Sequence, residues 1–455
     1  MIFFKRRRLL TWLLKAYFKK WRKTIFISFI VGLVVFFILK FGVNYFIPLI
    51  PFTQEETVGL VGAYTTDDLP SFILANVSKG LTETASDDSI KPALASSWDI
   101  QNNGKRYVFH LQKNVSFSDG TKLTSDQIKY NFLNVSIERP DPYTIIFNLK
   151  DAYSPFLVTV TRPIFRNGFI GIGDYKVNSI SLNGNFVQSL SLVSVKGKNK
   201  EIVYQFYPTE DSLKTALALT DVDKITGIRD LSIDGKNFTS FVNLTITKYV
   251  NYSSLVTVFY NTQDRILSDK RLREALTYAM PNNFPYGQRN YGPFSPKSWA
   301  NQDYSSTYQQ DLQHAKLLLN ESGSSSSGAA LRIELKTLER YKNIAYQIKS
   351  LWEKIGIETN IKVVDTLPTT FQVFLGEFNV TKDPDQYTLW HSSQINLDNI
   401  TNYKNLRIDK LLEDGRQTDN ISERKKIYAD FQKYLLDDAP ATFLYFPYEY
   451  EVTKK

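Results

Sequence analysis

The segment from residue 383 to residue 391 holds the residue types best suited to chemistry. It places two carboxylates around Pro384 and then two aromatic rings and an imidazole, at Asp383, Asp385, Tyr387, Trp390 and His391. Two carboxylates and an imidazole can bind a metal ion, or they can act as the general acid and the general base of a reaction. Fixed carboxylates beside an aromatic ring can instead hold the ammonium group of a ligand, through a charge-assisted hydrogen bond of about 1.5 to 3 kcal/mol. Because a proline separates the aspartates, a solvent-facing turn beside a packed tryptophan fits the same residues, and all three interpretations stay open.

The rest of the sequence argues against most enzyme classes. The chain has no cysteine, which excludes disulfides, thiolate zinc sites, iron–sulfur clusters and cysteine nucleophiles. Three histidines, His110, His314 and His391, leave little material for a histidine-based metal site. The signatures of phosphate loops, dinucleotide-binding turns, serine hydrolases and zinc peptidases are absent from the sequence. We therefore expect no cofactor, no metal and no catalysis, and the alternative is an anchored surface hydrolase that uses Asp383, Asp385 and His391.

The charge of the chain is distributed unevenly. The 455 residues carry a formal charge of +9, and ten of the 55 basic residues lie in the first 40 positions, which hold no acidic residue. The remainder is nearly neutral, whereas nucleic-acid binders carry a basic stripe across the folded domain. A composition of 43% apolar and 22% charged residues is typical of a globular protein. We therefore expect a globular protein with no nucleic-acid partner.

An apolar stretch from residue 25 to residue 47 predicts a membrane anchor. As a helix its 23 residues, with one charge at Lys40, would extend about 34 Å, enough for a hydrocarbon layer of about 30 Å. Nine Lys or Arg residues precede the stretch and none lies between residues 41 and 78, which predicts a cytoplasmic N-terminus. We therefore predict a basic amphipathic segment at 1–23, a single-pass signal anchor at 24–47 and an extracytoplasmic domain beyond it.

Strand and helix patterns alternate along the rest of the chain and predict an α/β fold. Two strand–helix–strand units are expected, at 201–207, 211–219 and 224–228, and at 331–335, 344–355 and 357–363. Three further helices are expected to begin near Ser125, Ser268 and Ser422, where a serine can cap the first turn. Two such units, about 100 residues apart, require at least two α/β lobes.

Many short segments are similar to one protein family. Residues 92–98, 103–109 and 115–121 resemble the lobe I signature of the extracellular solute-binding proteins of family 5, the peptide and nickel-chelate binding components of ABC importers. Further similar segments follow in the family order, at residues 206–208, 258–261, 271–276, 315–318, 355–357, 383–385, 390–393, 408–412 and 423–424. The resemblance extends from about residue 57 to the C-terminus.

The resemblance implies a two-lobed α/β fold like that of the periplasmic binding proteins, with an extra subdomain in lobe I. The implied parts are lobe I at 54–254, a hinge strand at 255–264 with Tyr260 and Asn261, lobe II at 265–440, and a second hinge crossing at 441–455 whose return to lobe I is cut short. The implied protein is a monomer that closes over a peptide or similar solute and delivers it to the permease subunits of an ABC importer. A peptide sensor or chaperone without transport is the alternative.

One position departs from the pattern of the family. In its peptide binders the aspartate that pairs with the ligand amine stands four residues before the proline of the turn, and Val380 occupies that position here. Either Asp383 or Asp385 takes over amine binding, with Tyr387, Trp390 and His391 beside them, or the ligand has no free amine.

Overall fold

The computed structural model describes residues 2–38, 40, 54–197, 200–233, 235–304, 307–322 and 331–455. It consists of two compact units, Met1–Glu55 and Glu56–Lys455, which we describe separately.

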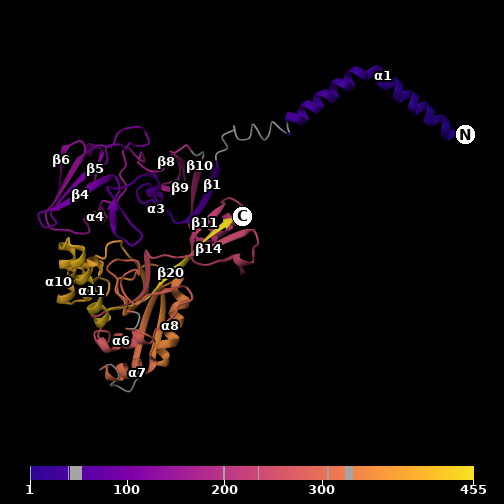
Figure 1. The fold of residues 1–455 in the computed structure, drawn as a ribbon. Coiled ribbons are helices and arrows are strands. Elements are labelled where there is room, and N and C mark those ends of the chain that lie inside the picture. Colours follow the sequence, from indigo (N-terminus) through magenta and orange to yellow (C-terminus); the bar gives the residue numbers. More distant parts are fainter. Residues whose placement is uncertain are drawn as a thin grey trace. The chain divides into compact units, whose positions relative to one another are not determined.

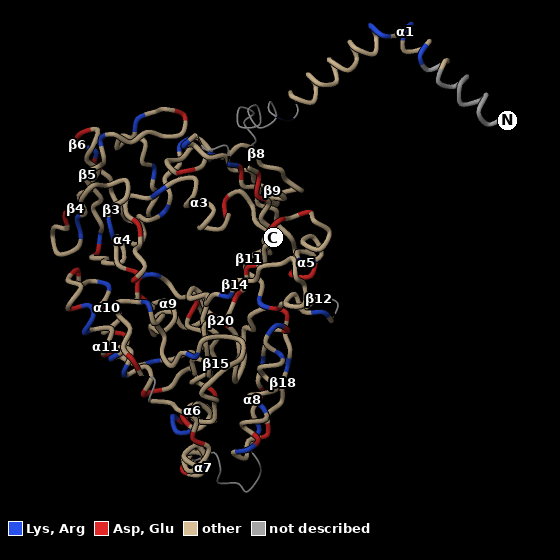
Figure 2. Tube along the Cα trace, turned by 45° about the vertical axis from the view of Figure 1, so that its right-hand side comes forward, with Lys and Arg blue, Asp and Glu red and all other residues tan. Residues whose placement is uncertain are grey.

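The first unit contains the helix α1 (Ile2–Phe37). Figure 2 shows basic segments and no acidic segment along it. Among the described residues, no helix carries an apolar stretch long enough to cross a membrane. The predicted anchor at 24–47 overlaps α1 as far as Phe37, and its residues 41–47 lie outside the described part of the chain.

The strands of the second unit form one large sheet, one four-stranded sheet and two short pairs. They are β1 (Gln54–Val61), β2 (Thr82–Thr84), β3 (Ile90–Pro92), β4 (Ala95–Gln101), β5 (Arg106–Leu111), β6 (Val135–Asp141), β7 (Thr144–Leu149), β8 (Tyr175–Asn183), β9 (Phe186–Ser194), β10 (Lys200–Tyr207), β11 (Lys224–Ile228), β12 (Ser232–Ile233), β13 (Lys236–Asn237), β14 (Leu244–Val250), β15 (Ser254–Tyr260), β16 (Gly287–Arg289), β17 (Leu331–Leu338), β18 (Ile357–Val364), β19 (Val373–Asn379) and β20 (Ala441–Lys454). The large sheet follows the order β18-β17-β19-β15-β20-β11-β1-β10-β9-β8, and β14 and β16 also pair with β20.

The described part of the second unit also contains α-helices and short 3-10 helices. The α-helices are α3 (Ser71–Val77), α4 (Phe156–Thr159), α5 (Glu210–Leu219), α6 (Lys270–Tyr278), α7 (Leu312–Glu321), α8 (Lys342–Lys354), α9 (Tyr387–Trp390), α10 (Leu406–Gln417) and α11 (Ile421–Asp438). Short 3-10 helices lie at Ser125–Gln127, Phe238–Ser240, Glu339–Tyr341 and Ser392–Gln394.

The part from β15 to the start of β20, which we call lobe II, has a hydrophobic core on each face of its sheet. All seven residues of β15 are buried. Because side chains alternate along a strand, Val256 and Val258 join the core beneath α6, α7 and α8, whereas Leu255 and Phe259 join the core beneath α10 and α11. Figure 1 shows α8 and the pair α10 and α11 on opposite sides of this lobe.

The part before β15, which we call lobe I, contains the β8, β9, β10, β1 and β11 end of the large sheet and a subdomain. The subdomain is the antiparallel sheet β4-β5-β7-β6 with its own core around Tyr107, Phe109 and Phe147. Between β4 and β5 the turn places Asn103 and Gly104 at φ 50° and 78°, as its residue types require.

Strand β20 is shared by the two lobes. Its first half pairs with β15 and its second half with β11 and β14, so Val452 lies opposite Ile225. Figure 1 shows the strand running from the orange lobe to the magenta strands. The prediction that the return to lobe I is cut short is therefore wrong, because 441–454 itself makes that return.

The other connection between the lobes lies earlier than the predicted 255–264. Strand β14 pairs with β20 in lobe I, and β15 pairs with β19 in lobe II, so the chain crosses at residues 251–253. Tyr260 lies inside lobe II, where it is fully buried and its hydroxyl lies 2.7 Å from Thr442 Oγ1. Asn261 follows it and donates a hydrogen bond to the Phe371 carbonyl at 3.1 Å.

The two predicted strand–helix–strand units are present as β10, α5 and β11 and as β17, α8 and β18, with β17 and β18 paired in parallel. The predicted helix starts are less accurate. Asp269 caps α6 and Asn420 caps α11 in place of Ser268 and Ser422, and only a single 3-10 turn follows Ser125.

Candidate functional site

A cavity of about 730 Å³ lies where the two lobes meet, and we call it the interlobe cavity. The ends of three strands bound it, because Val61 ends β1, Val250 ends β14 and Val380 follows β19. The crossing segment 251–253 lines it as well, and the Val380 amide donates to the Ser253 carbonyl at 2.9 Å. A cavity bounded by both lobes and by their connection changes shape when the lobes move relative to each other.

The wall of the interlobe cavity is partly apolar and aromatic. Its rings belong to Tyr64 and Phe72 of lobe I, to Tyr249 of β14 and to Tyr252 of the crossing segment. Burial raises the pKa of Tyr249, so this hydroxyl stays protonated at neutral pH. Aromatic walls with a few polar groups are typical of sites that bind small organic solutes.

An ion pair connects the two sides of the interlobe cavity. Lys382 Nζ of lobe II lies 2.8 Å from Asp88 Oδ1 of lobe I. The Asp88 side chain is 5% exposed, whereas that of Lys382 is 50% exposed. The Asp88 carboxylate therefore already has a cationic partner, and this ion pair links the two lobes in this conformation.

The second carboxylate of the cavity, that of Glu449 in β20, also has partners within the protein. It accepts hydrogen bonds from Asn251 Nδ2 at 2.8 Å and from the Tyr249 hydroxyl at 3.3 Å, and Arg229 Nε lies 3.5 Å away. Arg229 Nη1 also lies 3.0 Å from Glu377 of β19. Burial lowers the pKa of Arg229, but the nearby acids outweigh it, so the pKa is raised and this arginine stays charged.

Lys297 is the remaining charged residue of the cavity wall. Its ammonium lies 4.4 Å from the centre of the Tyr252 ring, within cation–π distance. Within the described part of the chain, no carboxylate lies within ion-pair distance of Lys297.

The predicted site residues Asp383 and Asp385 lie in ion pairs with arginines and do not line the interlobe cavity. Asp383 makes a two-point pair with Arg424, at 2.8 and 3.0 Å, and both side chains are buried. Asp385 Oδ2 lies 2.8 Å from Arg416 Nε, and burial raises the pKa of Asp385. The Oδ1 atom of each aspartate also accepts a hydrogen bond from the backbone amide two residues ahead, and these two bonds form the turn that Pro384 predicts.

Trp390 and His391 of the same segment are buried in lobe II, whereas Tyr387 is half-buried. Trp390 is buried and donates to Gln386 Oε1 at 2.8 Å. His391 stacks on Tyr387 at 4.0 Å between ring centres and lies 3.4 Å from Glu413, and neither Asp383 nor Asp385 is among its described partners. The described residues contain no cluster of histidine, aspartate and glutamate that could hold a metal ion. The ligand role predicted for these five residues stays a prediction.

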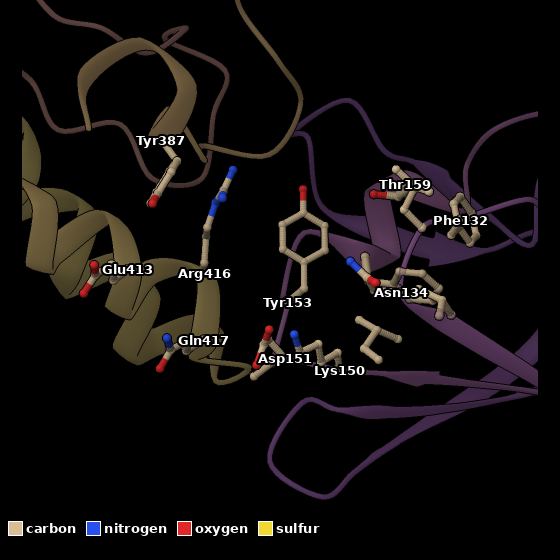
Figure 3. Close-up of a pocket in the computed structure, with 15 residues that line it drawn as sticks. Phe132, Asn134, Lys150, Asp151, Tyr153, Thr159, Tyr387, Glu413, Arg416 and Gln417 are labelled. Carbon is tan, nitrogen blue, oxygen red and sulfur yellow. The ribbon is translucent and has the colours of Figure 1, made fainter. Parts of the chain in front are cut away.

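A second cavity, of about 670 Å³, lies between the subdomain and helices α9 and α10. Figure 3 shows Arg416 between Tyr387 and Tyr153, and its guanidinium lies 3.9 Å from the first ring centre and 5.6 Å from the second. Tyr387 is the one predicted site residue that lines it. The Ser154 amide donates to the Arg416 carbonyl at 2.7 Å, so the lobes also touch here.

The comparisons with known proteins agree with this architecture. Residues 89–396 match the family described as bacterial extracellular solute-binding proteins, family 5 Middle, and the chain belongs to this family. It is 25% identical over 459 residues to the oligopeptide-binding protein AppA of Bacillus subtilis (strain 168), covering 84% of this chain and 83% of that protein.

Two solved structures show the same two-lobed α/β fold. The NikZ protein of Campylobacter jejuni in complex with Ni(L-His) superposes with a TM-score of 0.70 at 22% identity, covering 89% of this chain and 94% of that one. The ABC transporter substrate-binding protein CtaP of Listeria monocytogenes superposes with a TM-score of 0.73 at 21% identity, covering 88% and 94%.

Sequence reasoning missed the charged residues of the interlobe cavity. Asp88, Lys297 and Lys382 lie in loops with no distinctive pattern. Glu449 carries a signal, because it is the first charged residue in a strand that is apolar or aromatic up to that point except at Thr442.

Proposed function

We propose that this chain is the membrane-anchored, extracytoplasmic solute-binding protein of an ABC importer, and that it binds a peptide or similar solute in the interlobe cavity for delivery to the permease. The observation that carries the proposal is a cavity of about 730 Å³ lined by both lobes and by the segment that connects them. A ligand that contacts both lobes gains those contacts only when they are closed, so its binding shifts the population towards the closed form. The name of the AppA relative supports a peptide as the ligand.

The anchor in this proposal rests on the sequence. The apolar stretch at 25–47 and the basic residues before it favour a tether at the membrane surface. A tether keeps the binding domain at a high effective concentration near its permease. In cells that express the full chain, protease added from outside should degrade the 56–455 unit, and alkaline washing should leave the protein in the membrane fraction; a protected or washed-off protein would contradict the anchor.

Ligand binding can be tested with the full chain in detergent. Tripeptide libraries and nickel–histidine chelates are added, and the unfolding temperature and the retained compounds are measured. We expect a saturable rise in unfolding temperature and recovery of unchanged peptides by mass spectrometry. Cleaved peptides would favour the hydrolase alternative, and no retained solute of either kind would refute the proposed function.

A further inference from the structure

The charged groups of the interlobe cavity are equal in number, but they are not all paired with an opposite charge. Its wall contains two carboxylates, Asp88 and Glu449, and two ammonium groups, Lys297 and Lys382. Both carboxylates already have cationic partners within the protein, whereas among the described residues only one of the two ammonium groups, that of Lys382, has an anionic partner.

The two carboxylates are poorly placed to accept a cation from a ligand. The Glu449 carboxylate accepts two hydrogen bonds, and it also lies beside the guanidinium of Arg229, which is not among the residues that line the cavity. The Asp88 carboxylate is nearly buried against Lys382. A ligand ammonium would therefore have to displace an existing partner and leave that cation unpaired, which is unfavourable in a partly buried site.

Lys297 differs because its ammonium lies over the Tyr252 ring and, within the ranges that the structure describes, has no carboxylate partner. A cation–π contact leaves the N–H groups of the ammonium able to donate to an oxyanion. The Lys297 side chain is exposed at the wall, and Ser295 beside it lines the same cavity. An anionic group entering the cavity would thus gain a charge partner without breaking an ion pair.

We propose that the interlobe cavity selects solutes that carry a carboxylate, which Lys297 binds, and that it does not require a charged amine. This inference rests on the proposed function and specifies the class of its ligand. The apolar wall, which includes Phe72, Val250 and Val380, receives the body of the solute. The preferred ligands are therefore acids with an apolar or aromatic body and a neutral or absent amino group, such as N-acylated peptides.

The experiment uses the full chain in neutral detergent and one tripeptide library prepared in four forms: unmodified, N-acetylated, C-amidated and blocked at both ends. The retained amount of each form is measured by mass spectrometry. We expect C-amidation to lower retention about tenfold, a loss that corresponds to one charge-assisted contact, and N-acetylation to change it less than threefold. Equal retention of amidated and acidic forms, or loss of binding on N-acetylation, would overturn the inference.

Variants of Lys297 test whether this residue causes the difference in retention between the acidic and the amidated forms. Lys297→Met should abolish the difference between acidic and amidated forms, and Lys297→Arg should keep it. Lys248→Met is the matched control, because Lys248 of β14 also lies over a tyrosine ring, that of Tyr448 at 3.4 Å, but does not line the cavity. If Lys297→Met retains the wild-type preference while its unfolding temperature is unchanged, Lys297 does not bind the acid. If none of the four forms and no chelate binds to the wild type, the proposed function itself fails, whereas equal binding of all four forms refutes the inference alone.

Discussion

Lys382 Nζ lies 2.8 Å from Asp88 Oδ1, and this ion pair joins a loop that follows β19 of lobe II to the loop between β2 and β3 of lobe I. Because half of the Lys382 side chain is exposed, we expect the pair to contribute no more than about 1 kcal/mol to closure. Replacing both residues with neutral ones, as Asp88→Asn with Lys382→Gln, should therefore lower the closed fraction of the ligand-free protein two- to fivefold.

The closed fraction can be measured by the distance between two spin labels. The chain has no cysteine, so labels attach only at introduced positions such as Phe186→Cys in lobe I and Leu317→Cys in lobe II, which are both exposed. Glu83→Gln with Lys91→Gln is the control, because that pair lies within one hairpin of lobe I. An unchanged distance distribution in the Asp88 and Lys382 variant would show that the pair does not favour closure.

The ion pair of Asp383 and Arg424 is expected to stabilise the fold. Asp383→Asn leaves a buried guanidinium without its carboxylate, and this should lower the free energy of unfolding by about 3 to 5 kcal/mol in urea titrations. Arg332→Gln, in the exposed pair with Glu358, should cost less than about 0.5 kcal/mol. Peptide affinity of the folded Asp383→Asn protein should stay within twofold of wild type, and a large selective loss for free-amine peptides would support the predicted ammonium role of Asp383.

Stability should depend on pH through Glu377 of β19. Burial raises the pKa of this carboxyl, but Arg229 and the Ser254 hydroxyl at 2.6 Å outweigh burial, so the pKa of Glu377 is lowered from its ordinary value of 4.5. A lowered pKa means that the folded state binds the proton less strongly than the unfolded state. The stabilisation is therefore complete above pH 4.5 and is lost as the pH falls through the pKa of the folded state.

Glu377→Gln removes this dependence. The free energy of unfolding of the wild type should exceed that of the variant at pH 7, and the difference should shrink as the pH is lowered below 4.5. Urea titrations of both proteins between pH 3 and pH 7 measure it. A difference that stays constant over this range would show that Glu377 is not stabilised in its charged form.

A carboxylate introduced at Val380 should change ligand preference. Val380 lines the interlobe cavity without charge, so Val380→Asp provides an anion with no cationic partner of its own. Peptides with a free amine should then bind about tenfold more tightly than their N-acetylated forms, as measured by calorimetry. Val380→Asn is the neutral control of similar size and should show no such preference; equal binding of both peptide forms to Val380→Asp would mean that this position does not face the ligand amine.

The regular parts of the fold were predictable because their signals are local. The helix α8 repeats apolar residues at helical spacing, and Gly356 follows it at φ 98°, where a side chain would be strained. Helix starts were less certain, since Ser268 stands beside Asp269 and both residue types can cap a helix. Local sequence does not decide between two adjacent caps, because tertiary packing fixes the exact first turn.

The site was less predictable because its partners are distant in sequence. The sequence predicts the turn at Asp383 and Asp385, but the arginines that pair with these carboxylates, Arg424 and Arg416, lie on two different helices. The pairing of Glu449 with Arg229 joins residues 220 positions apart. The sequence therefore does not show whether a carboxylate is available to a ligand, because its cationic partner is identified only in the folded structure.

The shared strand β20 also has a consequence for biosynthesis. It follows every other strand that the structure describes, and it is the common neighbour of β11, β14 and β15. Until residues 441–454 leave the ribosome, strand edges in both lobes stay unpaired and exposed. A chain that stops before residue 441 would therefore lack a pairing strand in both lobes, and we expect such a fragment to be degraded by proteases.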